Sequence, residues 1–271
     1  MMVFVRRRWS VLLLLLTLPA LADAQGGRRR GRGTGAPSDW QGYVQSGDLA
    51  DITNPVYDGR FTFLRVRFEP AGGGDFGYRV DRKWDHDTPR AEIHFMKILS
   101  ELTTIRPFMN GGIILPFDSK ELFKYPIAYV SEPGFWSMND KERTGLQAYV
   151  AKGGFLIFDD FNTEHWYNFD RRWSEAFPNL KIVPLDVSNP IFDAFFRIEN
   201  LDFVHPYFGL KSEFYGAYED NDPKKRLVMV ANFNNDIGDY MEFSDESFLP
   251  IALSNKAYQL AVNYVVYALT H

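Results

Sequence analysis

Acidic and amide side chains directly follow three short apolar runs of the sequence. They are Glu132 after 127–130, Asp159 and Asp160 after 155–158, and Asn232, Asn234, Asn235, Asp236 and Asp239 after 227–230. Continuous apolar runs are typical of strands that are covered on both faces in a parallel sheet. Ligands bind outside the carboxyl ends of such strands. We therefore predict that these residues form one ligand-binding rim.

Carboxylates that are crowded at one rim can do two kinds of chemistry. Their mutual repulsion raises a pKa or recruits a cation, which makes Asp159, Asp160, Asn234 and Asp236 the candidate metal ligands. Two carboxyl groups can also act as general acid and base. The candidate catalytic residues are Glu132, Asp159 and Asp160, with His165, which lies shortly after the aspartate pair. No cofactor other than a divalent cation is predicted.

A purely structural interpretation of the same residues stays open. Asp and Asn often cap helices and form turns after strands. Asp160 could cap a helix that starts near Asn162, and residues 234–236 could form a turn before Gly238. An EF-hand is excluded for residues 232–243, because Ile237 replaces the required glycine and Phe243 the bidentate acid.

The other polar motifs give weaker signals. Asp85, His86 and Asp87 could contribute to a metal site, but their sequence favours a solvated loop. Neither a zinc-protease helix nor a serine-hydrolase elbow motif occurs. The aromatic residues Trp136, Trp166 and Tyr167 could stack on a sugar or simply pack near the rim.

The elements that must position the rim alternate between strands and helices. Strands are predicted at 61–68, 112–115, 127–130, 155–158, 182–185 and 227–230, and helical segments at 88–104, 139–152, 162–177, 190–196 and 252–269. Thr88 is the expected N-cap of the first helix, and Asn139 that of the second. This alternation predicts an α/β fold, a three-layer sandwich with a mostly parallel sheet.

The N-terminal region indicates export. Residues 1–24 combine a basic start, a short apolar run and an Ala-Asp-Ala cleavage motif, as signal peptides do. Residues 25–57 are predicted to be a flexible Gly/Arg-rich linker and irregular arm, and 58–271 the folded domain. The predicted location is the periplasm or the extracellular space. Membrane contact is expected only if the N-terminal segment stays uncleaved.

The charge and the lack of cysteine exclude several classes of function. Cleavage after Ala24 removes three arginines and one aspartate, which changes the net charge from −5 to −7. An acidic domain repels the nucleic acid backbone, so no nucleic acid partner is expected. Without cysteine the chain has no disulfide, no thiolate nucleophile and no iron–sulfur cluster.

Several longer motifs resemble a bacterial family of domains of unknown function, family 4159. They are FTFLRVRF at 61–68, LSELTTI at 99–105, FKYP at 123–126, SEPG at 131–134, GGFLIFDDF at 153–161, NFNNDIGD at 232–239 and NYVVYALTH at 263–271. The resemblance implies membership of the class I glutamine amidotransferase-like superfamily, with a flavodoxin-like sandwich. It also implies an exported or membrane-attached protein, and carries no established activity.

The superfamily resemblance bears on the chemistry as well. In true amidotransferases a nucleophilic cysteine sits at an elbow that would fall on Asp159 or Asp160 here, so glutaminase activity is excluded. Sugar-linked relatives such as trehalose-utilisation-like domains also lack this cysteine. The leading hypothesis is a non-catalytic binding or assembly module of the envelope. The alternative is a carboxylate-dependent hydrolase of a carbohydrate or related envelope substrate. The expected partner is a small molecule, a carbohydrate or an envelope protein.

Overall fold

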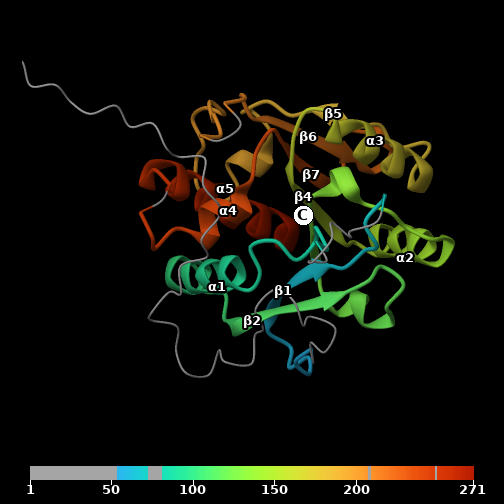
Figure 1. Cartoon of the computed structure of the whole chain (residues 1–271), viewed down its shortest axis with the longest axis horizontal. Helices are drawn as coiled ribbons and strands as arrows, with labels where there is room; N and C mark the ends of the chain where they lie inside the picture. Colours follow the sequence, from blue (N-terminus) through green and yellow to red (C-terminus); the bar gives the residue numbers. More distant parts are fainter. Residues whose placement is uncertain (1–53, 73–80, 207–208, 248) are drawn as a thin grey trace, which may run out of the picture. The chain divides into compact units, whose positions relative to one another are not determined.

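The apolar runs of the sequence form one seven-stranded sheet in the computed structural model, which describes residues 54–72, 81–206, 209–247 and 249–271 (Figure 1). The strands are β1 (Phe61–Val66), β2 (Pro107–Leu115), β3 (Ile127–Ser131), β4 (Phe155–Phe161), β5 (Val183–Pro184), β6 (Glu213–Tyr218) and β7 (Leu227–Phe233). Their order across the sheet is β2-β1-β3-β4-β7-β6-β5. The five strands from β2 to β7 run parallel, and β6 pairs antiparallel with both β7 and β5.

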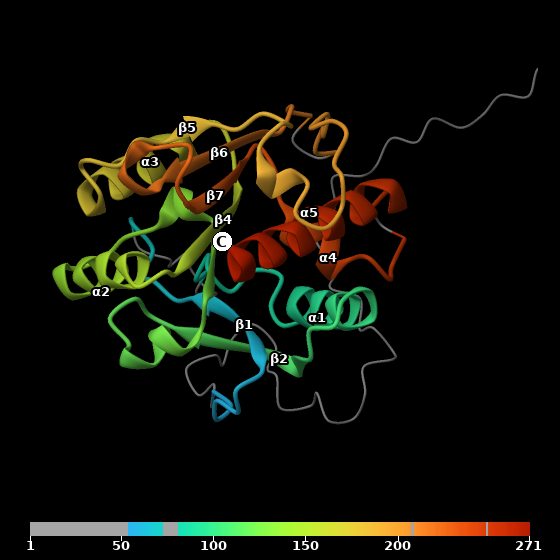
Figure 2. The same cartoon turned by 180° about the vertical axis from the view of Figure 1, so that it is seen from behind.

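Helices cover both faces of the sheet, as Figures 1 and 2 show. They are α1 (Arg90–Leu102), α2 (Asp140–Ala151), α3 (His165–Ala176), α4 (Ile237–Glu242) and α5 (Ile251–Thr270), with 3-10 turns η3 (Lys120–Lys124), η4 (Pro133–Phe135), η5 (Pro190–Phe192) and η6 (Glu219–Asn221). One core cluster joins α1, α4 and α5 to the sheet, and a second joins α2 and α3 to the opposite face. The predicted α/β fold with a mostly parallel, doubly covered sheet is therefore confirmed.

Burial on both faces explains the continuous apolar runs. All five residues of β3 are buried, and six of the seven residues of β7. Strands of this kind lose the alternation that a half-exposed strand shows. The final helix, α5, is apolar on most sides for the same reason, since ten of its residues are buried. Among the described residues, no helix has both the length and the apolar character needed to cross a membrane.

Two helix starts test the capping predictions. Asn139 caps α2 through a capping box with Glu142, and the helix ends before Gly153, whose φ is +98°, as predicted. The predicted Thr88 cap of α1 is wrong. That helix begins at Arg90, and the N-cap residue is Pro89, which has no side chain that could accept a hydrogen bond.

Other elements differ from the sequence predictions. β6 and α4 were not predicted, β2 starts earlier than expected, and α3 begins at His165, later than predicted. In β6, Gly216 interrupts the strand pattern; a Cβ there would lie 2.6 Å from the Leu227 side chain, so close packing requires the glycine. The predicted signal peptide and residues 25–53 of the predicted linker and arm lie outside the described residues.

Candidate functional site

The carboxyl ends of β3, β4 and β7 lie side by side at one edge of the sheet. Ser131 pairs with Asp159, and Phe161 pairs with Phe233, so the residues that follow these strands share that edge. Glu132, Asp160 and Asn234 all have left-handed backbone there, with φ of 45°, 59° and 56°. Non-glycine residues rarely adopt this conformation away from turns or functional sites.

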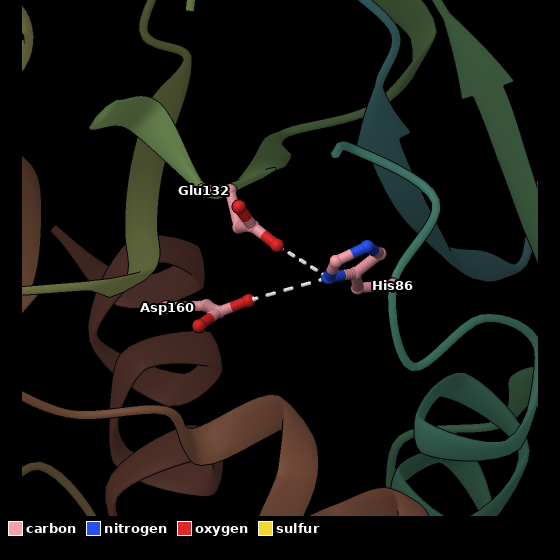
Figure 3. A group of neighbouring side chains, drawn as sticks. All are labelled: His86, Glu132 and Asp160. Atoms are coloured by element: carbon pink, nitrogen blue, oxygen red, sulfur yellow. Dashed lines mark ion pairs between the residues drawn. The ribbon is translucent and has the colours of Figure 1, made fainter. Parts of the chain in front are cut away.

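The segment that connects β1 to α1 reaches the same edge. Figure 3 shows His86 of this segment facing Glu132 and Asp160. Its Nδ1 is ion-paired with Glu132 Oε1 and lies 4.0 Å from Asp160 Oδ2. Its Nε2 lies 2.9 Å from Asp81 Oδ1. The strand order changes direction between β1 and β3, which is where open α/β sheets place their ligands.

The charges around His86 control its protonation. Burial alone would lower the pKa of His86, but the hydrogen bond and charge of Glu132, with Asp160 and Asp81, raise this pKa to about 9. Lys83 adds a second cation at the same place, with Nζ 2.8 Å from Asp81 Oδ2 and 3.4 Å from Glu132 Oε2. The imidazole of His86 is therefore charged at neutral pH when no metal is bound.

A deeper set of carboxylates lies next to this group. Asp87, Asp160 and Asp236 each offer an oxygen, and the three oxygens lie within 4.8 Å of one another. Burial is the main reason why the pKa of each is well above the ordinary value, and the charges of neighbouring carboxylates raise these pKa values further. Asp87 is 8% exposed, and its Oδ2 is buried with no hydrogen-bond partner among the described residues.

Two more residue groups extend the set. His205, Asp236 and Asp239 form one, and Asp87, Asp239 and Glu242 form the other, each with potential ligand atoms within 4.8 Å. We call all of these residues together the acidic cluster. Its members are His86, Asp87, Glu132, Asp160, His205, Asp236, Asp239 and Glu242. Oxygen-rich sets with few imidazoles are the ligands that Mg²⁺, Ca²⁺ and Mn²⁺ prefer.

Asp159 lies apart from the acidic cluster and supports it. Its carboxylate accepts hydrogen bonds from Tyr129 (2.6 Å), Asn232 (2.9 Å) and the backbone N–H of Gly238 (3.0 Å). Burial raises the pKa of Asp159 to about 6, although these hydrogen bonds oppose the rise. Because Gly238 belongs to α4, Asp159 fixes the start of the helix that carries Asp239.

The other residues that the sequence placed at this edge have different roles in the structure. Asn232 accepts from Tyr264 (2.7 Å) and belongs to the Asp159 network. Asn234 accepts from the backbone N–H of Thr163 (3.2 Å) and lies outside the cluster. Asn235 is fully buried, and neither polar atom of its side chain has a hydrogen-bond partner within the described part of the chain. Asp236 caps α4 by accepting from Asp239 N–H (2.8 Å).

The structure places the two histidines that the sequence singled out in different surroundings from those expected. His165 packs against Phe135 with 4.8 Å between ring centroids, and it belongs to none of the potential ligand groups. Burial lowers the pKa of His165. The solvated loop predicted around His86 is also wrong, because Asp87 is buried and His86 is ion-paired at the edge of the sheet. Of the aromatic candidates, Trp136 is fully buried core, whereas Tyr167 is 78% exposed.

His86 and Asp87, for which the sequence favoured a solvated loop over a metal site, follow β1, a strand parallel to β3. The rule that ligands bind outside the carboxyl ends of parallel strands therefore applied to His86 and Asp87 too. The sequence did not show this position, because the connection between Val66 and Arg90 is long. The two residues come just before α1 and not just after the strand.

The charge on His86 predicts how stability changes with pH. A raised pKa stabilises the folded protein fully below the unfolded value of 6.5, and this contribution is lost as pH rises through the folded value of about 9. We expect the cation-free protein to lose up to about 3 kcal/mol of unfolding free energy between pH 6.5 and 9.5. Urea unfolding in EDTA measures this loss. His86→Gln should show a smaller loss, and equal wild-type stability at the two pH values would contradict the assigned ion pairs.

The structure is thus an α/β protein with a group of crowded carboxylates at the carboxyl edge of a mostly parallel sheet. The family model named Domain of unknown function (DUF4159) matches residues 63–269. The chain therefore belongs to this family, as its motifs predicted. A search of curated proteins found no match.

Proposed function

We propose that this chain is a binding module that holds a divalent cation in its acidic cluster. The observation that carries the proposal is the set Asp87, Asp160 and Asp236, whose oxygens lie within 4.8 Å of one another without a neutralising ion pair to Asp87 or Asp236 among the described contacts. Three carboxylates this close must either bind protons or bind a cation. One oxygen of Asp87, Oδ2, is buried and has no hydrogen-bond partner among the described residues, so it is available to bind a cation.

Thermal melting tests this proposal. A cation that binds only the folded state stabilises it by about 2.7 kcal/mol at a concentration 100 times its Kd. For a domain of this size that corresponds to a rise in Tm of roughly 5–10 °C. We expect Mn²⁺, Mg²⁺ or Ca²⁺ to raise the Tm of EDTA-treated protein, and chelator to reverse the rise. An unchanged Tm with each of these cations and with Zn²⁺ at millimolar concentration would contradict the proposal.

A carboxylate-dependent hydrolase is a second candidate, favoured by the pair Glu132 and Asp160 at His86. Burial and the charge of Glu132 raise the pKa of Asp160, which suits a general acid at neutral pH. The substrate class would be a carbohydrate or related envelope compound. A panel of ester, amide and glycoside substrates tests this candidate. Turnover that disappears in Asp160→Asn would support the hydrolase. If no substrate is turned over, the result contradicts the hydrolase and favours the binding module.

We also propose that the α/β fold is of the flavodoxin-like type. Taken in chain order, the five parallel strands have the order 2-1-3-4-5, which is the order of flavodoxin-like sheets. This order supports the flavodoxin-like, amidotransferase-like relationship that the sequence motifs imply. The absence of cysteine still excludes glutaminase chemistry by a thiolate.

Export to the periplasm or the cell exterior completes the proposal. Its support is the signal-peptide pattern of residues 1–24. Expression of the full chain in a bacterium, followed by N-terminal sequencing of the periplasmic fraction, tests it. A mature chain that starts at Gln25 is expected, and a full-length chain confined to the cytoplasm would contradict export.

A further inference from the structure

Asp160 belongs to two potential ligand groups at once. It shares the first with Asp87 and Asp236, and the second with His86 and Glu132. The first group contains only carboxylate oxygens, whereas the second adds one imidazole. A carboxylate has two oxygens, so a single aspartate can bind a different cation with each of them. Asp160 is thus placed where a bridging ligand between two cations would lie.

Charge compensation favours more than one cation. The two groups that share Asp160 contain four carboxylates, and one divalent cation offsets only two negative charges. The lysine and arginine nearest to these groups form no ion pair with Asp87, Asp160 or Asp236 among the described residues. Lys83 is ion-paired with Asp81 as well as Glu132, and Arg65 is ion-paired with the buried Glu92.

The surroundings of His86 match those of a metal ligand. Its Nδ1 faces Glu132 and Asp160, and its Nε2 lies 2.9 Å from the carboxylate of Asp81 (Figure 3). Histidines that bind metals nearly always donate their other ring N–H to a carboxylate, a carbonyl or a water. In the first group, Asp87 has one buried oxygen, Oδ2, that accepts no hydrogen bond from the described residues.

We propose that the acidic cluster is a two-cation centre in which Asp160 bridges an inner cation, held by Asp87 and Asp236, and an outer cation, held by His86 and Glu132. The inference rests on the proposed cation site and extends it. The all-oxygen inner group suits Mg²⁺, Ca²⁺ or Mn²⁺, and the outer group, with its imidazole, suits Mn²⁺ or Zn²⁺. Mn²⁺ is compatible with both groups, so it is the probe of choice. Asp81 acts as a positioning residue for the outer cation through Nε2 of His86.

Counting bound Mn²⁺ tests the two-cation centre. The full chain is dialysed to equilibrium against Mn²⁺, the bound metal is measured, and the electron paramagnetic resonance spectrum is recorded. We expect two Mn²⁺ per wild-type chain, with the spectrum of a magnetically coupled pair. His86→Gln and, independently, Glu132→Gln should each bind one Mn²⁺, with the six-line spectrum of an isolated ion. Asp140→Asn, on an 88% exposed side chain, should behave as the wild type does.

The outcomes separate the two levels of the proposal. One Mn²⁺ per wild-type chain would overturn the two-cation centre and leave the single-cation site intact. No bound Mn²⁺ would overturn both. Two uncoupled Mn²⁺ ions, or two ions retained in folded His86→Gln and Glu132→Gln proteins, would overturn the bridging role of Asp160 and the outer ligand set. Circular dichroism establishes that each variant is folded, so a loss of binding cannot come from unfolding.

Discussion

Replacing Arg65 with methionine is expected to destabilise the folded protein by about 3–5 kcal/mol, the usual cost of breaking a buried ion pair by removing one partner. Both side chains of the Arg65–Glu92 pair are only 1% exposed, and Nε lies 2.6 Å from Glu92 Oε1. Arg65→Met would leave the carboxylate of Glu92 buried without its partner. It would also remove the hydrogen bond from Nη1 to the carbonyl of Trp84 (3.2 Å). Urea unfolding at pH 7 measures the loss.

Two further variants make this prediction specific. The double variant Arg65→Met with Glu92→Met should recover most of the lost stability, because apolar residues of similar volume often replace a buried pair without cost. Arg143→Met, which breaks an exposed pair with Asp140, should change stability little. A double variant that is no more stable than Arg65→Met alone would contradict the assigned cause.

The same ion pair links the core to the site. Trp84, whose carbonyl Arg65 holds, lies two residues before His86 and three before Asp87. Arg65→Met should therefore weaken Mn²⁺ binding as well as folding. The Mn²⁺ affinity is measured without urea, at a temperature where the variant stays folded. An unchanged affinity would show that Arg65 does not position the segment that carries His86 and Asp87.

Replacing Asp236 with asparagine is expected to weaken cation binding by at least about 100-fold, since even outer-sphere partners of metal ligands are worth 10- to 100-fold. The variant keeps the side-chain oxygen that accepts from Asp239 N–H at 2.8 Å, so the cap of α4 is preserved. It removes one charge from a group whose repulsion and burial raise the pKa of each member. At neutral pH the cation-free variant should therefore be at least as stable as the wild type.

Asp236→Ala separates the cap from the charge. It removes both, so we expect it to lose cation binding and also about 1 kcal/mol of stability from the missing cap. The measurement is thermal melting of the three proteins with and without Mn²⁺. An Asp236→Asn protein whose Tm still rises with Mn²⁺ as the wild type does would exclude Asp236 as a ligand.

Sequence reasoning found several of the residues at or after the carboxyl ends of three strands. Glu132, Asp160, Asp236 and Asp239 were predicted to meet at one edge, and the structure brings them together because β3, β4 and β7 are adjacent and parallel. The prediction worked because a buried parallel strand has a distinctive apolar run, and because the strand-end rule depends on the fold alone.

The sequence could not distinguish Asp159 from Asp160. The pairing of β4 with β7 shifts register between Phe158 and Phe161, and Asp160 has left-handed backbone with φ of 59°. These local features direct Asp160 into the acidic cluster, while Asp159 forms hydrogen bonds to Tyr129 and Asn232. Such a bulge depends on pairing between strands that are far apart in the chain, so no local pattern predicts it.

The sequence ranked His86 below His165 and did not predict α4, for a different physical reason. The choice of His165 over His86 followed closeness in sequence, whereas closeness in space comes from the parallel pairing of β1 with β3. The helix α4 has only six residues and begins one residue after its cap, Asp236. A helix this short shows too few turns for apolar periodicity to be recognised, and tertiary contacts such as Asp159 to Gly238 stabilise it.

Anomalous X-ray diffraction from crystals of the protein soaked in Mn²⁺ tests the cation site most directly. The prediction is a strong anomalous peak bonded to carboxylate oxygens of Asp87, Asp160 and Asp236. Peaks found only at exposed carboxylates such as Asp245, or none at a saturating Mn²⁺ concentration, would contradict a cation site in the acidic cluster.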